Sequence, residues 1–188
     1  MHDLLQKIQQ DVSFRTKVLK WTGIGFATAL LTFGLMLWLI GFRPSAGQVE
    51  AGVEIDRITL QVWPWVAEPE LQKQWIGGLV EVRQKSPQHV VWVMSDGGDS
   101  RMEIQGEITE RTMPVVLKMN VHAPGDFSGV SEFRVVELAA GRTKVEMLGQ
   151  YRYDSWFYRL LEPLITPRAI EKTKQDLLRL KQKMETNP

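Results

Sequence analysis

Residues 113–121 read MPVVLKMNV and decide the fold, because their apolar side chains return at every second position. The apolar set is Met113, Val115, Leu117, Met119 and Val121. A period of two residues is that of a β-strand with one buried face and one solvated face. The same alternation continues on either side, in residues 101–110 and 127–137. The pattern predicts an antiparallel sheet, since such sheets commonly leave one face to water.

Strand and turn signals extend this sheet in both directions along the chain. Residues 95–99 (SDGGD) and 122–126 (HAPGD) are typical of turns between antiparallel strands. Pro64 and Pro69 interrupt residues 59–75, which predicts two short helices, because proline breaks helix interiors. Seven strands are predicted, at residues 53–58, 79–83, 90–94, 101–110, 113–121, 127–137 and 143–153.

A long amphipathic helix is predicted at the end of the chain, over residues 156–184. Pro163 and Pro167 are expected to kink its first part. Beyond them, apolar residues recur at helical spacing opposite a basic face. The apolar face holds Ala169, Ile170, Thr173, Leu177, Leu180 and Met184, and the basic face holds Lys172, Lys174, Arg179 and Lys183. One curved antiparallel sheet with a helix laid across it is an α+β arrangement.

An uncharged apolar segment precedes this domain. Residues 21–42 (WTGIGFATALLTFGLMLWLIGF) would span about 33 Å as a helix, enough to cross a bilayer. A buried core helix and a cleaved signal peptide are the alternatives, but the apolar region of a signal peptide is shorter, at about 7–15 residues. We expect a transmembrane helix at 21–42, between a short amphipathic tail at 1–20 and a linker at 43–52. One domain follows, at 53–188.

The charges that flank the apolar segment predict its direction. Arg15, Lys17 and Lys20 precede it, whereas Arg43 stands alone after it. The positive-inside rule then places the N-terminus in the cytoplasm and the domain outside it. The chain has no cysteine and no Asn-x-Ser/Thr site, which suits a bacterium. We therefore expect a single-pass protein of the bacterial inner membrane with its domain in the periplasm.

The composition excludes several classes of function. From Pro44 onward the net charge is −2, so nothing indicates a nucleic-acid binder. The absence of cysteine removes thiolate chemistry. The three histidines, His2, His89 and His122, fall on the tail or at turns, and no metal-ligand spacing occurs. Asp96 and Asp99 belong to the glycine turn. No catalytic residue, metal or cofactor is predicted.

Three stretches resemble the START-like (SRPBCC) superfamily. They are residues 58–63 (ITLQVW) with 68–70 (EPE) and Trp75, then 140–145 (AGRTKV), and finally 176–181 (DLLRLK). The superfamily includes polyketide cyclases and aromatases, plant carriers of hydrophobic ligands and coenzyme Q-binding proteins. The resemblance implies the helix-grip fold, in which a curved seven-stranded sheet wraps a long C-terminal helix.

The resemblance also implies a cavity between the sheet and that helix. Strand parity and helix spacing predict its lining as Met102, Ile104, Leu117, Met119, Phe133, Val135, Val145, Met147, Tyr151, Leu177 and Leu180. The mouth is expected at Trp63, Trp65 and Trp75. Methionine adapts to irregular apolar ligands. The alternative is a closed core, because alternating apolar strands need no ligand to explain them.

The leading hypothesis is a membrane-anchored module that binds a hydrophobic small molecule, a lipid or an isoprenoid. A polyketide cyclase or aromatase-type enzyme is the second, although Tyr151 is the only ionisable residue predicted to face inward. A ligand-free structural or assembly subunit of a membrane protein complex is the third. The expected partners are membrane lipids, the hydrophobic molecule and, in the third case, that complex.

Overall fold

The computed structural model describes residues 25–26, 28–36, 38–39, 47–95, 97–98, 100–139 and 141–186. The chain divides into two units, Met1–Arg43 and Pro44–Pro188. The second unit holds every strand described below and the helices that pack on them. Its elements follow the order β1 (Gly47–Ile55), α2 (Thr59–Ala67), α3 (Pro69–Gln72), β2 (Leu79–Gln84), β3 (His89–Ser95), β4 (Arg101–Thr112), β5 (Val116–Ala123), β6 (Phe127–Ala139), β7 (Arg142–Tyr153) and α4 (Trp156–Thr186).

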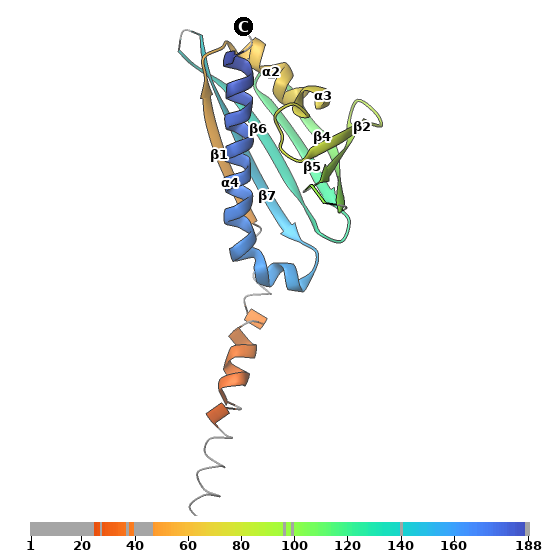
Figure 1. The fold of residues 1–188 in the computed structure, drawn as a ribbon, viewed down its shortest axis with the longest axis vertical. Coiled ribbons are helices and arrows are strands. Elements are labelled where there is room, and N and C mark those ends of the chain that lie inside the picture. Colours follow the sequence, from red (N-terminus) through yellow and green to blue (C-terminus); the bar gives the residue numbers. More distant parts are fainter. Residues whose placement is uncertain are drawn as a thin grey trace, which may run out of the picture. The chain divides into compact units, whose positions relative to one another are not determined.

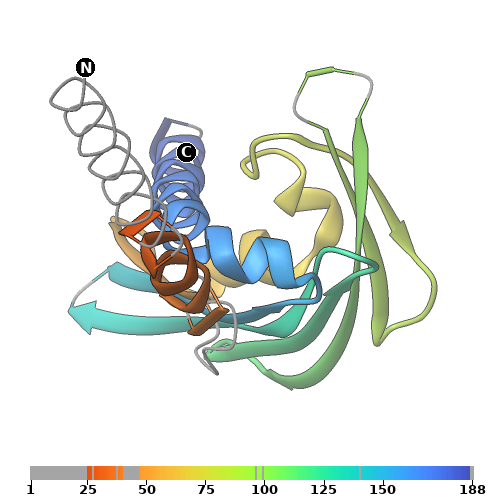
Figure 2. The ribbon, with the colours of Figure 1, turned by 90° about the horizontal axis from the view of Figure 1, so that it is seen from below.

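The seven strands form one antiparallel sheet in the order β1-β7-β6-β5-β4-β3-β2 (Figure 1). Neighbours in sequence pair with one another, except that β1 pairs with β7 at the edge. Figure 2 shows the sheet curving around α4, with α2 and α3 on the same side. The predicted α+β class, the curved sheet and the long C-terminal helix are confirmed.

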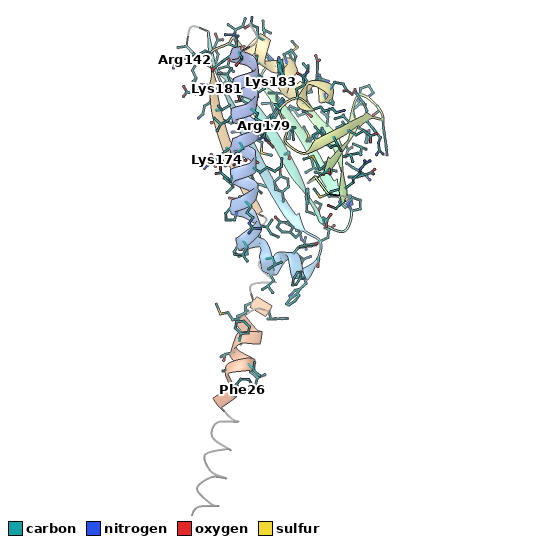
Figure 3. The ribbon with its side chains drawn as sticks, in the orientation of Figure 1. Phe26, Arg142, Lys174, Arg179, Lys181 and Lys183 are labelled. Carbon is teal, nitrogen blue, oxygen red and sulfur yellow. The ribbon has the colours of Figure 1, made fainter. Side chains whose placement is uncertain are left out.

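Helix α4 buries one face and exposes a basic face. Leu177, Leu180 and Met184 are buried at spacings of three and four residues, as an amphipathic helix requires. Lys174 and Lys183 lie on the exposed side (Figure 3). The first turns of α4 run at an angle to the rest (Figures 1 and 2). Pro163 and Pro167 lie inside the helix, and proline is a common cause of such a bend.

A buried carboxylate on α4 fixes the helix to the loop between α3 and β2. Asp176 Oδ1 accepts the Gly77 N–H at 2.9 Å, and Oδ2 accepts from Lys172 Nζ at 2.7 Å. The Arg179 guanidinium also bonds Asp176, and its Nε donates to the Trp75 carbonyl at 3.0 Å. Gly77 leaves the room for this guanidinium, since a Cβ there would lie 2.3 Å from an Arg179 nitrogen.

Several predicted boundaries differ from the structure, and two of these differences have a clear physical reason. Strand β1 begins at Gly47, so residues 47–52 of the expected linker belong to the sheet edge and pair with β7. The small residues of this stretch gave no clear alternation of apolar and polar side chains in the sequence, although Val49 and Ala51 are buried. The expected strand at 113–121 begins only at Val116. Its first three residues turn the chain from β4 to β5, and Pro114 has no N–H to give a ladder.

The apolar segment predicted at residues 21–42 belongs to the first unit and is described only in part. Its described residues are helical. Large apolar side chains along it are exposed, namely Phe26 (Figure 3), Leu30, Leu31, Phe33, Leu35, Met36, Trp38 and Leu39. Among the residues that the structure describes, no helix combines the length and the apolarity needed to cross a bilayer. The predicted tail at 1–20 and residues 43–46 lie outside the described residues.

Candidate ligand-binding cavity

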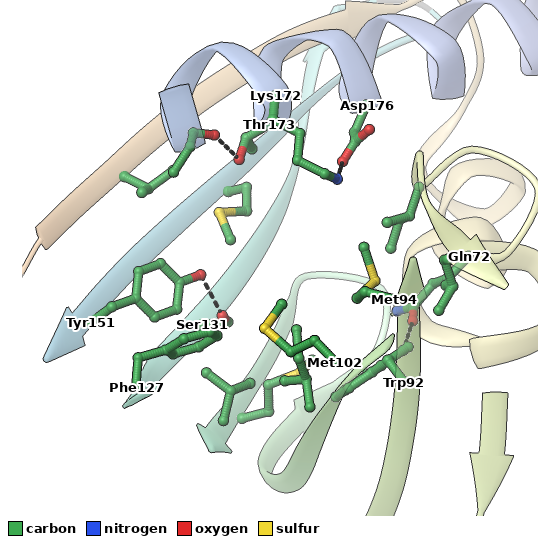
Figure 4. Close-up of a pocket in the computed structure, with 18 of the residues that line it drawn as sticks. Gln72, Trp92, Met94, Met102, Phe127, Ser131, Tyr151, Lys172, Thr173 and Asp176 are labelled. Atoms are coloured by element: carbon green, nitrogen blue, oxygen red, sulfur yellow. Dashed lines mark hydrogen bonds and ion pairs between the residues drawn. The ribbon is translucent and has the colours of Figure 1, made fainter. Parts of the chain in front are cut away.

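A cavity of about 500 Å³ lies between the concave face of the sheet and α4 (Figure 4). This volume falls within the range of sites for drug-sized ligands. Its wall draws on all seven strands, on α4 and on the segment after α2. The lining residues are Val49, Gln72, Trp75, Ile76, Leu79, Trp92, Met94, Met102, Ile104, Met119, Val121, Asp126, Phe127, Ser131, Phe133, Met147, Tyr151, Tyr153, Tyr158, Ile165, Ala169, Lys172, Thr173, Asp176 and Leu177.

Most of this wall is apolar and adaptable. Four methionines from the sheet face the space, at positions 94, 102, 119 and 147. Methionine side chains are unbranched and polarizable, so they fit ligands of irregular outline. The Trp75 and Phe133 rings meet edge to face, with centroids 6.3 Å apart. A flexible apolar floor beside rigid aromatic rings suits a hydrophobic ligand.

The structure brings seven of the eleven predicted lining residues together in the wall, namely Met102, Ile104, Met119, Phe133, Met147, Tyr151 and Leu177. The other four, Leu117, Val135, Val145 and Leu180, are at most 2% exposed and belong to the closed core. Helix α2 packs on β6 and β7 and contributes Val62 and Val66 to the same core cluster. Strand parity gives the direction of a side chain, but it does not tell which end of the sheet α2 fills.

The predicted mouth of three tryptophans is not found. Trp63 and Trp75 are buried, and Trp65 is half-buried against the core. The Trp75 Nε1–H donates to the Trp65 carbonyl at 2.9 Å, which holds Trp75 in the cavity wall. Other lining residues are more exposed than these tryptophans. Met102 is 36% exposed and Tyr158 is 38% exposed.

A buried pair that the sequence analysis missed closes one end of the cavity. The Trp92 Nε1–H donates to Gln72 Oε1 at 2.8 Å, and Gln72 Nε2 donates to the Val66 carbonyl at 2.6 Å. The Trp92 ring lies against the backbone of Gly106, where a Cβ would be 2.2 Å from the ring. The apolar run at 90–94 gave no face preference. The isolated glycine at 106 was the available signal, since glycine in a strand marks close approach.

A second polar pair lies across the cavity. The Tyr151 and Ser131 hydroxyl oxygens are 2.8 Å apart (Figure 4). The Phe127 ring meets the Tyr151 ring edge to face, with centroids 5.5 Å apart. Burial raises the pKa of the Tyr151 hydroxyl, and the Ser131 hydrogen bond opposes that rise in part. Tyr151 was predicted to face inward, whereas Ser131 was not among the predicted lining residues.

The charged groups in the wall are few. On α4, Lys172 and Asp176 pair with each other above the cavity (Figure 4). Neither histidine that the structure describes, His89 or His122, lines the space. No cluster of three or more metal-binding side chains occurs among the described residues. Asp96 and Asp99 lie outside the described residues. This wall can enclose and orient a ligand, but it offers no evident base beside a nucleophile.

Comparisons with known proteins agree with this architecture. The family model for polyketide cyclase / dehydrase and lipid transport matches residues 46–185. A START superfamily protein from Mycobacterium smegmatis has a TM-score of 0.63 at 12% identity, over 75% of this chain and 99% of that one. A conserved protein from Geobacillus kaustophilus has a TM-score of 0.65 at 10% identity, over 74% and 95%.

An aromatase/cyclase from Streptomyces sp. R1128, Zhui, has a TM-score of 0.58 at 13% identity, over 73% of this chain and 93% of that one. No functionally curated protein matches the sequence. At such identities the solved structures show the fold alone, and the START-like resemblance of the domain is confirmed. The family model covers nearly the whole second unit. The chain belongs to the polyketide cyclase / dehydrase and lipid transport family.

Proposed function

We propose that the domain binds a hydrophobic molecule of lipid or isoprenoid type in the cavity beneath α4. The observation that carries the proposal is a space of about 500 Å³ with an apolar, methionine-rich wall. Protein interiors pack to a density that leaves few voids larger than a water molecule. A closed structural core would therefore have no reason to keep this space.

The two other functions receive less support from the same wall. A cyclase-type enzyme needs ionisable groups that converge on the ligand, whereas Lys172 and Asp176 are committed to each other. Ser131 lies beside a tyrosine rather than a base. An assembly subunit without a ligand would be expected to fill the cavity with its own side chains.

Filling the cavity is expected to abolish binding. Ala169 lines the space from α4, so Ala169→Phe places a ring inside it. We expect the affinity for the neutral fluorescent probe N-phenyl-1-naphthylamine to fall at least about tenfold, the equivalent of about 1.4 kcal/mol. Native mass spectrometry of the purified protein should show that any co-purifying lipid is lost as well.

Leu178→Phe is the matched control, since Leu178 lies on the same helix and is 57% exposed. It should bind the probe as the wild type does. A folded Ala169→Phe variant that keeps full probe affinity would contradict the proposed cavity site.

We also propose that residues 21–42 anchor the protein in a membrane, with the domain on the periplasmic side. The exposed apolar side chains of Phe26, Leu30, Leu31, Phe33, Leu35, Met36, Trp38 and Leu39 support the anchor, because exposed apolar surface is unfavourable in water. The charges that flank the segment support the orientation. At the start of α4, Trp156, Phe157 and Leu164 are also exposed, and aromatic residues favour membrane interfaces.

Two arginines in the apolar segment should release the protein from the membrane. A charge at a helix centre costs about 2.5–3.5 kcal/mol on insertion. We expect Leu31→Arg/Leu35→Arg to move the full chain from the carbonate-resistant membrane fraction to the soluble fraction. Leu31→Phe/Leu35→Phe should stay in the membrane, and a C-terminal alkaline phosphatase fusion to the wild type should be active. A wild type that carbonate extracts would contradict the anchor, and an inactive fusion would contradict the orientation.

A further inference from the structure

The Ser131–Tyr151 pair occupies a position that two glycines make possible. Ser131 on β6 stands opposite Gly149 on β7, and the Tyr151 ring leans back over Gly149 to reach it. A Cβ at position 149 would lie 2.5 Å from the Tyr151 hydroxyl oxygen. A Cβ at Gly129 would lie 2.2 Å from the Gln150 carbonyl and 2.9 Å from the Tyr151 ring. The local backbone therefore leaves the room that this ring needs.

One O–H group of the Ser131–Tyr151 pair is not used in the hydrogen bond between them. Each hydroxyl has one O–H group, and their mutual bond uses only one of the two. Among the described residues, neither side chain bonds to any other group. Both side chains line the cavity, and Figure 4 shows the two hydroxyls at its edge. The remaining O–H is thus available to an oxygen atom of a ligand.

Four other polar side chains of the wall, on α3 and α4, are already engaged in hydrogen bonds or an ion pair. Gln72 bonds the Val66 carbonyl and the Trp92 indole. Thr173 donates to the Ala169 carbonyl at 2.8 Å, and Lys172 is paired with Asp176. The remaining charged lining residue, Asp126, is itself acidic. An anionic ligand would have to compete with Asp176 for Lys172, the one cation among the described residues of the wall, and a buried charge without a partner is strongly unfavourable.

We propose that Ser131 and Tyr151 form an oxygen-recognition subsite that selects uncharged hydrophobic molecules with a hydroxyl or carbonyl group. The oxygen accepts the free O–H of the pair, and the hydrocarbon part extends across the cavity toward Met94 and Met102 (Figure 4). The Tyr151 hydroxyl is neutral near neutral pH, as an ordinary tyrosine is, and burial raises its pKa further. This inference rests on the proposed function, because it describes the ligand of the same cavity.

Displacement of bound N-phenyl-1-naphthylamine tests the subsite. Decan-1-ol and decan-2-one carry the oxygen, butylbenzene has the same number of carbons without it, and decanoate is the anion. In the wild type, decan-1-ol should displace the probe at lower concentration than decanoate. In Tyr151→Phe/Ser131→Ala, the alcohol and the ketone should bind about three- to tenfold more weakly, as loss of one neutral hydrogen bond predicts. Butylbenzene should bind both proteins equally, because it has no oxygen to accept a hydrogen bond. Each compound is compared between the two proteins, so the free energy of its own hydration cancels.

Ser128→Ala is the matched control. Its hydroxyl lies on the same strand but at the opposite parity, so it faces away from the cavity. This variant should keep the preference for the alcohol and the ketone. Equal loss for butylbenzene and the alcohol, no loss for either, or tighter binding of decanoate than of decan-1-ol would each overturn the subsite. Failure of the probe to bind the wild type would instead overturn the proposed function, and the subsite with it.

Discussion

A Gly106→Ala variant is expected to lose about 1.5–4.5 kcal/mol of its free energy of unfolding. The added Cβ would lie 2.2 and 2.5 Å from two atoms of the buried Trp92 ring. Overpacking of this kind costs about 1–3 kcal/mol. Moving the ring also breaks its hydrogen bond to Gln72, which contributes about another 0.5–1.5 kcal/mol. Urea denaturation followed by circular dichroism measures the loss.

Gly52→Ala is the control for this prediction. Gly52 also lies in a strand, but a Cβ there meets no atom closer than 3.4 Å, which is an ordinary contact. Glycine within a strand is about 0.5–1 kcal/mol less favourable than alanine, so Gly52→Ala should be neutral or slightly stabilising. If Gly106→Ala behaved in the same way, the position of Trp92 against the β4 backbone would be wrong.

Strands with one solvated face were predictable from the sequence. Residues 101–110 alternate strictly, and β4 spans Arg101–Thr112. The run at 90–94 was located but its faces were not, because Val91 and Val93 are buried on the outer side as well. There the Arg83 guanidinium bonds Glu81 at 2.8 Å and Glu103 at 2.9 Å, on the two strands that flank Val93. Side chains of the neighbouring strands thus bury Val93 on the outer face of the sheet. Which side chains do so depends on the pairing register of the strands, and no local sequence pattern gives that register.

The sequence predicted which face of the sheet lines the site, but not how far the site extends along that face. Parity placed Met119 and Met147 toward the helix, and both line the cavity. Gln72 was not predicted, because its role depends on contact with Trp92, twenty positions away in the sequence. Asp176 was assigned to the family-like helix end, whereas its contact with Gly77 spans 99 positions. Such pairs depend on the positions of α3 and α4 in the folded domain, which no local sequence pattern gives.

Leu180→Ala distinguishes the closed core from the cavity wall. The sequence predicted Leu180 as a lining residue, but it is fully buried and belongs to the core cluster. Truncation of a buried leucine leaves a void and costs about 2–5 kcal/mol. We expect a loss of that size in urea denaturation, while the exposed Leu178→Ala, two positions away, should change stability by no more than about 0.5 kcal/mol.

Binding separates the two interpretations of Leu180 further. Leu180 does not border the cavity, so folded Leu180→Ala should bind N-phenyl-1-naphthylamine with an affinity within about twofold of the wild type. A tenfold change in affinity would correspond to about 1.4 kcal/mol of binding free energy. A residue of the cavity wall would show the reverse pattern. Its truncation enlarges a space that already exists, so the binding of the probe would change more than the stability does. A stable Leu180→Ala variant with altered binding would therefore place Leu180 in the wall, as strand and helix periodicity alone suggested. The expected unstable variant with unchanged binding would place the end of the cavity between Leu177 and Leu180, one helical turn along α4.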